Sequence, residues 1–247
     1  MSYEQNVEQL STLSLHGMAE LYELHQDDTS IQSLSFDERL GLLIDSETHY
    51  REQRRQIRFT KAAKLKDPQA CLENIDYTRK RGIEKSRIKE LSACRWITQH
   101  QHIFLEGSTG TGKTFIANAL ASQAIRLGHK VIYKRLSRLL EETEIARADG
   151  TLPNLRLKLS KFKVIILDDW GVNPITARGR QDLLELVEDK TGTGSIVVTS
   201  QLPVKKWHEW LGDETIADAI LDRIVHRAHI LKLKGESMRK VKGLEES

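Results

Sequence analysis

The residues with the clearest chemical pattern lie in the stretch GSTGTGKT, where Gly107, Gly112, Lys113 and Thr114 have the spacing G-x-x-x-x-G-K-[ST]. Glycines allow a turn whose backbone N–H groups point inward and form a nest for anions, and the lysine adds a mobile positive charge. The threonine hydroxyl is a ligand for Mg²⁺ in loops of this kind. The pattern therefore predicts a loop that binds nucleotide phosphates. The predicted binding residues are Gly107, Ser108, Thr109, Gly110, Thr111, Gly112, Lys113, Thr114 and Phe115.

Two carboxylates, Asp168 and Asp169, follow the apolar run VIIL about 55 residues after this loop. In an open α/β sheet, ligands gather at the carboxyl ends of the strands, so we expect both carboxylates beside the phosphates. Asp168 is predicted to hold Mg²⁺. Asp169 is predicted to orient and help deprotonate the water that attacks the γ-phosphate.

A further polar cluster, Thr199, Ser200 and Gln201, ends the run SIVV. These residues could place a polar group near the γ-phosphate and the attacking water, or they could cap a helix that begins near Pro203. Three arginines, Arg223, Arg227 and Arg239, flank the last predicted strand. Each could act on the nucleotide, and for each the alternative is a surface ion pair.

The phosphate loop requires a strand before it and a helix after it, and the sequence predicts both. Residues 102–107 form a short apolar run typical of a strand, while Ile116, Ala119, Leu120 and Ala124 recur at the spacing of one helix face. From residue 69 onward, strand-like runs alternate with helical stretches, which predicts an α/β fold with a parallel sheet covered by helices. The five predicted strands span residues 102–107, 130–136, 164–169, 195–200 and 229–235.

The N-terminal segment is predicted to be a separate domain of consecutive helices. Ser35 and Glu38 have the spacing of a capping box, and Leu40, Leu43 and Ile44 are expected to face a core. Asp67-Pro68 should end the last helix, because the residue before a proline is disfavoured in the α region. We therefore expect a helical domain at 1–67 and an ATPase-type domain at 68–247.

Composition is typical of a cytoplasmic protein. Of the 247 residues, 39% are hydrophobic and 30% charged, which suits a real core under a heavily charged surface. No apolar run approaches the roughly 18 residues of a membrane-spanning helix. Cys71 and Cys94 have neither metal-ligand spacing nor a disulfide framework, so small core residues in a reducing compartment are expected.

Charge is distributed unevenly near the N-terminus. Residues 1–50 contain ten Asp or Glu and one Arg, whereas residues 51–66 contain seven Lys or Arg and one Glu. Most of these cations recur at three- and four-residue steps along one helix face, which favours contact with DNA phosphates over an ordinary solvated face of mixed sign. The predicted DNA-binding residues are Arg51, Arg54, Arg55, Arg58, Lys61 and Lys64. A second cluster contains two acidic residues, Glu84 and Glu90, which favours an ordinary charged surface over DNA contact. This cluster comprises Arg79, Lys80, Arg81, Lys85, Arg87 and Lys89.

Several motifs together resemble the insertion-sequence ATP-binding proteins, a family of IstB-like transposition helpers. They are GSTGTGKT, VIILDDWG, VTSQLPVKKWHE, ADAILDRIVHRAH and KLKGES, with LHGMAELYE and LSFDERLGLLIDSE near the N-terminus. The resemblance covers nearly the whole chain and implies an AAA+ ATPase related to the bacterial helicase loader and the replication initiator. It implies a homo-oligomer with ATP and Mg²⁺ at its subunit interfaces, which assembles on duplex DNA, recruits and stimulates a partner transposase, and helps to choose the insertion target.

The resemblance also implies roles for individual residues. Lys113 and Thr114 would bind phosphate and Mg²⁺, Asp168 would support the metal, and Asp169 would support hydrolysis. Gln201 falls at the position of a polar sensor. Arg223 best matches an arginine that reaches the nucleotide of a neighbouring subunit, Arg227 is the second choice, and Arg239 is a weaker candidate for a sensor in the nucleotide's own subunit.

Two departures from the broad AAA+ pattern affect these expectations. Asp169 stands where the usual residue is a glutamate, and because it is one methylene shorter we expect slow turnover, stimulated by DNA or transposase. Few residues follow the last predicted strand, so little or no C-terminal lid is expected and the next subunit would enclose the nucleotide.

Other functions remain open at this point. One is a nucleotide-gated DNA adaptor in which hydrolysis is incidental, and another is a helicase loader that acts in replication. A small-molecule kinase also begins from a phosphate loop, but the sequence offers no recognisable acceptor pocket or mobile lid for it.

Overall fold

The computed structural model describes residues 2–25, 29–78 and 81–238. The chain divides into two compact units, Met1–Arg58 and Phe59–Ser247. The division falls within one long helix, α4 (Phe36–Ala63). Each unit is described separately below.

The last turns of α4 belong to the second unit, because Phe59, Ala63 and Leu65 are buried in its core. The helix ends at Ala63, and the next residue, Lys64, has a positive φ of 50°. The expectation that Asp67-Pro68 ends this helix is therefore wrong, since a left-handed residue ends it earlier. The two units divide at Arg58, before that dipeptide, because Phe59 already packs in the core of the second unit.

The first unit is helical. Its other helices are α1 (Tyr3–Thr12), α2 (His16–Leu24) and α3 (Thr29–Gln32). Gly17 on α2 lies so close to α4 that a Cβ there would be 2.6 Å from the Ser46 carbonyl oxygen. The buried carboxylate of Glu47 accepts hydrogen bonds from the N–H groups of Gly17 and Met18 at the start of α2. A close contact and a capped helix start thus hold α2 against α4.

The start of α4 confirms one prediction and corrects another. Ser35 Oγ accepts a hydrogen bond from the Glu38 N–H, and the Glu38 carboxylate accepts one from the Ser35 N–H, which is the predicted capping box. Leu40 and Ile44, however, are 39% and 47% exposed, and Leu43 is only half-buried. The expectation that all three face a core is wrong for this unit, since its few short helices cover little of α4.

The second unit is built on one sheet of five parallel strands in the order β2-β3-β4-β1-β5. The strands are β1 (His102–Gly107), β2 (Val131–Arg135), β3 (Val164–Trp170), β4 (Ser195–Ser200) and β5 (Ala228–Leu233). All five lie at their predicted positions, with ends that differ by no more than two residues. The predicted parallel α/β fold is therefore confirmed.

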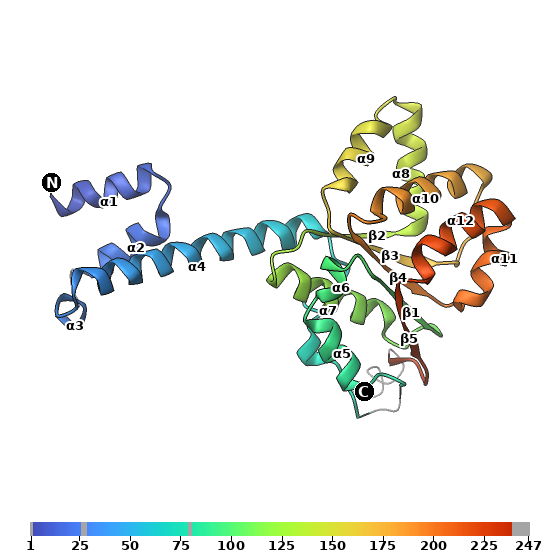
Figure 1. Cartoon of the computed structure of the whole chain (residues 1–247), viewed down its shortest axis with the longest axis horizontal. Coiled ribbons are helices and arrows are strands. Elements are labelled where there is room, and N and C mark those ends of the chain that lie inside the picture. Colours follow the sequence, from blue (N-terminus) through green and yellow to red (C-terminus); the bar gives the residue numbers. More distant parts are fainter. Residues whose placement is uncertain (1, 26–28, 79–80, 239–247) are drawn as a thin grey trace, which may run out of the picture. The chain divides into compact units, whose positions relative to one another are not determined.

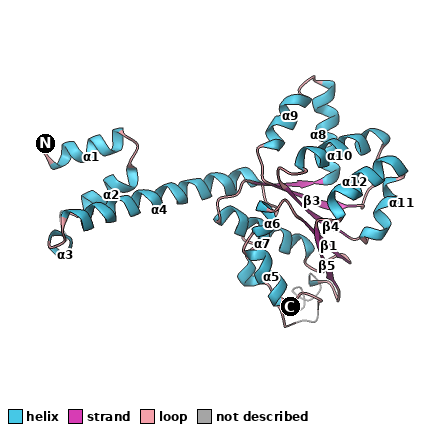
Figure 2. Cartoon of the chain, viewed as in Figure 1, coloured by secondary structure: helices cyan, strands magenta, loops and turns pink. Residues whose placement is uncertain are grey.

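Helices cover both faces of this sheet, so that the unit has three layers (Figure 1). One face is covered by α5 (Lys85–Ser92), α6 (Arg95–Thr98), α7 (Lys113–Arg126) and the 3-10 helix Leu72–Asn74. The other is covered by α8 (Leu136–Ala148), α9 (Leu152–Ser160), α10 (Ala177–Lys190), the 3-10 helix Val204–Lys206, α11 (Trp207–Leu211) and α12 (Glu214–Val225). Figure 2 shows the strands as the central layer between these helices.

Alternation along the strands assigns side chains to the two cores. On β1, Ile103 and Leu105 pack on the α7 side, whereas Phe104 packs on the other side. There the Phe104 ring lies 4.8 Å from that of Trp207, which in turn contacts Trp170. The sheet is thus buried on both faces, as expected of a parallel sheet. Within the described ranges, no helix has the length and apolar character needed to cross a membrane.

Candidate nucleotide-binding site

The predicted phosphate loop joins β1 to α7, as its motif requires. The first N–H groups of α7 have no acceptor within the helix and carry the positive end of its dipole. Gly110 and Gly112 have φ values of 82° and 95°, which side chains rarely adopt. A Cβ at Gly110 would lie 2.0 Å from Ser237 Oγ, and one at Gly112 would lie 3.0 Å from an Arg81 guanidinium nitrogen. The loop is therefore a tight backbone nest that only glycine permits.

Side chains of the loop are arranged around this nest. Lys113 is 8% exposed, and its Nζ donates hydrogen bonds of 2.7 Å to the carbonyl oxygens of Gly107 and Ser108. Ser108 and Thr109 are exposed, whereas Thr111 is fully buried. The Phe115 ring packs against the hydrophobic core, so this residue would offer a ligand its backbone rather than its ring.

Asp168 lies at the carboxyl end of β3 and is fully buried. Its Oδ1 accepts hydrogen bonds from the Thr114 hydroxyl, at 2.9 Å, and from the Thr199 hydroxyl. Its Oδ2 accepts one from the Tyr133 hydroxyl at 2.6 Å and lies 3.6 Å from Lys66 Nζ. The Thr114 hydroxyl at the end of the loop and the first carboxylate, which are 54 residues apart, are thus in direct contact.

This environment sets the charge of Asp168. Burial acts to raise its pKa, but hydrogen bonds from Thr199, Tyr133 and Thr114 and the charge of Lys66 outweigh burial, so the pKa lies below its ordinary value. Burial and the hydrogen bond to Asp168 both raise the pKa of the Tyr133 phenol. Asp168 is therefore an anion at neutral pH, and Tyr133 is a neutral donor.

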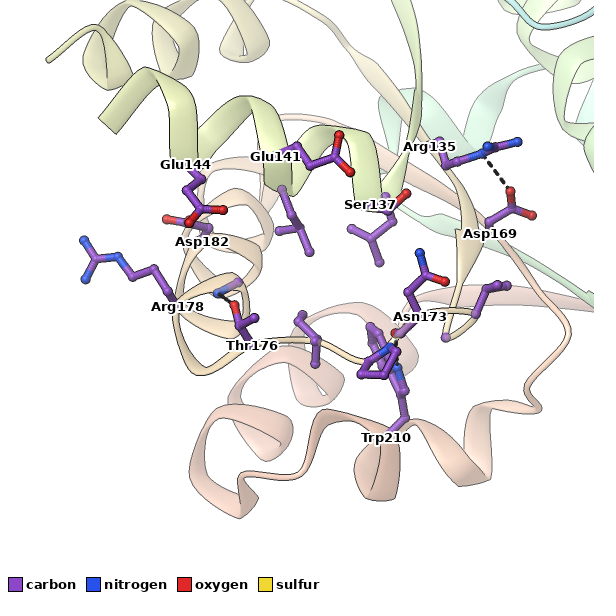
Figure 3. A pocket seen from close by; sticks show the side chains of 17 residues that line it. Arg135, Ser137, Glu141, Glu144, Asp169, Asn173, Thr176, Arg178, Asp182 and Trp210 are labelled. Carbon is purple, nitrogen blue, oxygen red and sulfur yellow. Dashed lines mark hydrogen bonds and ion pairs between the residues drawn. The ribbon is translucent and has the colours of Figure 1, made fainter. Parts of the chain in front are cut away.

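Asp169 lies in a different environment from its neighbour. Its φ is 62°, and the pairing of β3 with β4 is irregular between Leu167 and Trp170. The Asp169 carboxylate forms an ion pair of 2.9 Å with Arg135, at the end of β2. Both residues lie at the wall of a cavity of about 400 Å³ between α8 and the segment that joins β3 to α10 (Figure 3). Glu141, on α8, lines the same cavity.

The polar residues at the end of β4 were expected either to lie at the nucleotide site or to cap the next helix, and the structure distinguishes between these roles. Thr199 Oγ1 donates to Asp168 and accepts from the Asp169 N–H, so it links both carboxylates. Ser200 Oγ accepts from the Leu202 N–H and donates to the Trp170 carbonyl, which stabilises the turn that follows β4. Gln201 is exposed at that turn. Thr199 thus lies at the site and Ser200 supports the adjoining turn.

The three candidate arginines do not share one environment. Arg223, on α12, forms an ion pair of 2.9 Å with Glu188 on α10 and also donates to the Ala219 carbonyl. Arg227 is exposed beside β5. Arg239 lies outside the described residues. In the single chain, Arg223 therefore forms the surface ion pair that was its alternative interpretation.

The predicted basic stripe is exposed along its whole length. Arg51 pairs with Glu47 at 2.6 Å, and Arg55 lies 3.9 Å from Glu52. Lys64 lies one residue beyond the end of α4, so the helical stripe itself ends at Lys61. Arg51 to Arg58 belong to the first unit, whereas Lys61 and Lys64 belong to the second.

The second basic cluster is not a uniform surface. Arg79 and Lys80 lie outside the described residues. Arg81 is 7% exposed and donates to the carbonyl oxygens of Thr111 and Asp76, so it packs against the phosphate loop. Arg87 contacts Glu90 and His229. The exposed members are Lys85 and Lys89.

The residues present fit a magnesium–nucleotide complex. Mg²⁺ takes oxygen ligands, commonly one or two from the protein with the remainder from water and substrate phosphates. The Thr114 hydroxyl and the Asp168 carboxylate supply such oxygens beside a backbone nest and a lysine ammonium, which suit phosphates. When bound, the complex would supply the phosphoryl group to be cleaved.

Sequence reasoning missed several residues that the fold brings to the site. Tyr133 could have been found from the sheet, because β2 pairs with β3 and its residues reach the same edge. Arg135 stands opposite Asp168 in that register. The position of Lys66 at the site could not be predicted, since in the sequence it is only the last cation of a basic run. Arg81 was assigned to a surface cluster, and nothing local indicates that it is buried.

Comparison with known proteins gives a consistent result. A family model described as "IstB-like ATP binding protein" matches residues 8–245. The chain is 40% identical over 234 residues to a protein of Sinorhizobium fredii named "Putative insertion sequence ATP-binding protein", and the alignment covers 95% of each chain.

Solved structures resemble the chain in fold. The crystal structure of DnaI matches with a TM-score of 0.58 at 18% identity, over 67% of this chain and 92% of that one. The structure of AMPPCP-bound DnaA from Aquifex aeolicus matches with a TM-score of 0.55 at 18% identity, over 72% of this chain and 54% of that one. These similarities confirm the expected P-loop NTPase fold.

Proposed function

The chain belongs to the IstB-like ATP-binding proteins, and from this membership we propose that it is an AAA+ ATPase that assembles on duplex DNA and serves a transposase in insertion-sequence transposition. The observation that carries the ATPase proposal is the 2.9 Å hydrogen bond between Thr114 and Asp168. It joins the phosphate loop to the carboxyl end of β3, where two oxygen ligands for Mg²⁺ and an anion nest meet. Two oxygen ligands beside an anion nest suit a nucleoside triphosphate bound together with Mg²⁺.

Residue roles in the proposed hydrolysis follow from these positions. Lys113 and the loop N–H groups bind the phosphates, while Thr114 and Asp168 hold the metal. Asp169 accepts a proton from the attacking water, and Thr199, which bonds both carboxylates, fixes their relative position. Gln201 acts as the polar sensor. The Arg135 ion pair must open before Asp169 can act, which supports slow turnover of the single chain.

Assembly and DNA contact form the second part of the proposal. Arg223 reaches the nucleotide of a neighbouring subunit, so that ATP is bound between copies of the chain, and Arg227 is the alternative. The exposed cations of α4, from Arg51 to Lys61, contact DNA phosphates without reading bases, and Lys64 adds to them. The partner transposase is recruited by the assembled form. Both cysteines are free thiols, which suits action in the cytoplasm.

One observation supports a second candidate. Because Asp169 is engaged by Arg135, the protein could use ATP as a structural ligand, with hydrolysis incidental to DNA binding. This adaptor would share the nucleotide site and the DNA surface with the ATPase. It would differ in needing no proton acceptor.

A pair of substitutions tests the proposal. Lys113→Ala should weaken binding of a fluorescent ATP analogue by about 10- to 100-fold, because it removes a charged hydrogen-bond donor from the phosphates. Asp169→Asn should leave that affinity nearly unchanged and lower ATP turnover, measured with duplex DNA and transposase, by about 100-fold. Asp149→Asn is the matched control, since Asp149 is exposed at the end of α8.

The outcomes distinguish the two candidates. Loss of transposition in the Asp169→Asn protein, with nucleotide binding intact, supports the ATPase. Full transposition by that variant would leave the adaptor as the better description. Absence of Mg²⁺-dependent nucleotide binding by the unaltered chain would refute both.

A further inference from the structure

We infer that the Lys66 ammonium competes with Mg²⁺ for the Asp168 carboxylate, and that the segment carrying Lys66 moves when a magnesium–nucleotide complex binds. This inference rests on the proposed function, because it assigns the metal to Thr114 and Asp168. It adds a residue whose role is to occupy the carboxylate in the nucleotide-free chain. Lys66 is thus a positioning residue rather than a catalytic one.

The first argument is the number of acceptor sites on Asp168. A carboxylate has two oxygens with about four lone-pair sites. Two hydroxyls, from Thr114 and Thr199, occupy Oδ1. The Tyr133 hydroxyl donates a hydrogen bond of 2.6 Å to Oδ2, and Lys66 Nζ forms an ion pair with the same oxygen at 3.6 Å, which is beyond hydrogen-bond distance. The three hydroxyls therefore leave about one acceptor site, on the Oδ2 oxygen that is paired with Lys66. A metal ion or a metal-bound water that approaches this site must displace the Lys66 ammonium or one of the hydroxyls.

The second argument is which of the four groups can leave. The three hydroxyls belong to α7, β2 and β4, which are regular elements, and Thr199 is 1% exposed. Lys66 belongs to the irregular segment after α4, and its side chain is 40% exposed. A partly exposed ammonium on a flexible stem returns to water at small cost. Lys66 is the group that can leave most easily.

The third argument is charge. Asp168 is fully buried, and a buried carboxylate is stable only when charge or hydrogen bonds compensate it. The Lys66 ammonium supplies a positive charge in the nucleotide-free chain. A metal ion supplies more charge at the same carboxylate, so exchange of the two cations keeps Asp168 ionised throughout.

The exchange has a consequence for the segment around Lys66. Leu65 is buried beside it, and the Asp67 N–H donates a 3.4 Å hydrogen bond to Asn118 Oδ1 on α7. Asn118 also donates to the Thr114 carbonyl oxygen. The segment that follows α4 is therefore held to the metal site by the Lys66 ion pair and by the Asn118 contact. Release of Lys66 loosens one of these two links.

The first experiment measures the magnesium requirement of nucleotide binding. Binding of a fluorescent, non-hydrolysable ATP analogue is titrated with free Mg²⁺ for the unaltered chain and for Lys66→Met, Lys66→Arg and Lys161→Met. Removing the competing charge should lower the Mg²⁺ concentration at half-maximal binding by about 3- to 10-fold in Lys66→Met. Lys66→Arg keeps the charge and should restore the original value. Lys161→Met changes an exposed lysine after α9 and should have no effect.

The second experiment observes the ammonium directly. Brief acetylation of the unaltered chain, read by mass spectrometry, compares the protein alone, with the analogue in EDTA, and with the analogue and Mg²⁺. Acetylation of Lys66 should increase about threefold or more only with the metal–nucleotide complex, because release from the ion pair raises its exposure. Lys161 serves as the internal reference.

Each result has one meaning. An unchanged magnesium requirement in Lys66→Met, or decreased acetylation of Lys66 on binding, overturns the inference while leaving the proposed function intact. Weaker binding of Lys66→Met both with Mg²⁺ and in EDTA would mean that Lys66 contacts phosphate, which also overturns it. If the unaltered chain binds no nucleotide, the proposed function itself fails.

Discussion

Single residues in this site have roles that depend on what surrounds them. Asp168 and Asp169 are adjacent and chemically identical, yet Asp168 is buried among three hydroxyls and an ammonium, whereas Asp169 is 37% exposed at the side chain and paired with Arg135. The irregular β3–β4 pairing and the left-handed backbone at Asp169 separate the two environments. One carboxylate thereby suits a metal ligand and the other a proton acceptor.

A buried histidine gives a prediction at this scale. His102 is 2% exposed, and its Nδ1 accepts a hydrogen bond from the Ile196 N–H, so the ring is neutral. Burial, followed by the charges of Arg227 and His100, lowers its pKa to about 4. The folded state binds this proton less readily than the unfolded state, in which the pKa is 6.5. The free energy of unfolding should therefore fall as pH falls from 6.5 to 4, by about 2 kcal/mol between pH 7 and pH 5.

Urea denaturation at pH 7 and pH 5 measures this effect. In the His102→Asn protein, the Asn amide oxygen can still accept a hydrogen bond from the Ile196 N–H. The free energy of unfolding should therefore decrease between pH 7 and pH 5 by about 2 kcal/mol less than in the unaltered chain. His226→Asn, which changes an exposed histidine, should retain it. An equal decrease in the unaltered chain and in His102→Asn would mean that His102 does not titrate in this range.

At the scale of elements, α4 has two distinct surroundings. Its first part belongs to the helical unit, where Leu40 and Ile44 are exposed, and its last turns are buried in the sheet-containing unit. The exposed cations, Arg51 to Arg58 in the first unit and Lys61 in the second, follow helical spacing along α4. The proposed DNA contact is therefore a property of one helix face, not of a folded pocket.

Charge reversal on α4 tests this proposal. Arg54→Glu with Arg58→Glu should weaken duplex binding in the presence of an ATP analogue by about 30-fold or more, because two phosphate contacts become repulsive. The dependence of log affinity on log salt should also become shallower by about 2. Fluorescence anisotropy over a range of ionic strengths measures both.

The matched control is Lys205→Glu with Lys206→Glu, which reverses two exposed lysines on the short helix after β4. This change alters the net charge by the same amount as the α4 variant. Similar losses in both variants would indicate a general effect of net charge, and salt-independent binding would exclude phosphate contact by α4.

At the scale of the whole molecule, the proposed enzyme is incomplete as a single chain. Arg223 pairs with Glu188 on its own surface. Among the described residues, Arg81 donates to the Thr111 carbonyl of the phosphate loop, but it is not one of the candidates for an arginine that acts between subunits. The proposed assembly brings Arg223 to a neighbour's nucleotide. ATP hydrolysis should then depend on protein concentration.

Mixed oligomers test this dependence. Arg223→Ala and Lys113→Ala chains should each be inactive alone, because one lacks the guanidinium and the other cannot bind phosphate. Mixing them should recover about a quarter of the unaltered ATPase rate, since some interfaces pair an intact loop with an intact arginine. In the control mixture, Arg95→Ala, which changes an exposed arginine on α6, replaces Arg223→Ala. No recovery, with assembly of the mixture verified by light scattering, would count against a role for Arg223 between subunits.

The sequence by itself determined the phosphate loop, the five strands, their parallel α/β arrangement and the capping box of α4. These features depend on residues close together in the chain, because glycine spacing, alternation of apolar residues and caps act over a few positions. The sequence also predicted that Asp168 lies at the same edge of the sheet as this loop, since parallel strands end at one edge.

Only the tertiary structure decided which other residues complete the site. Lys66, Tyr133 and Arg81 reach Asp168 or the loop from separate segments, and no local pattern distinguishes them from ordinary surface or core residues. Likewise, α4 ends at Ala63, before the left-handed residue Lys64, and not at the following proline. Burial and charge pairing depend on which distant segments meet, and that is a property of the folded chain.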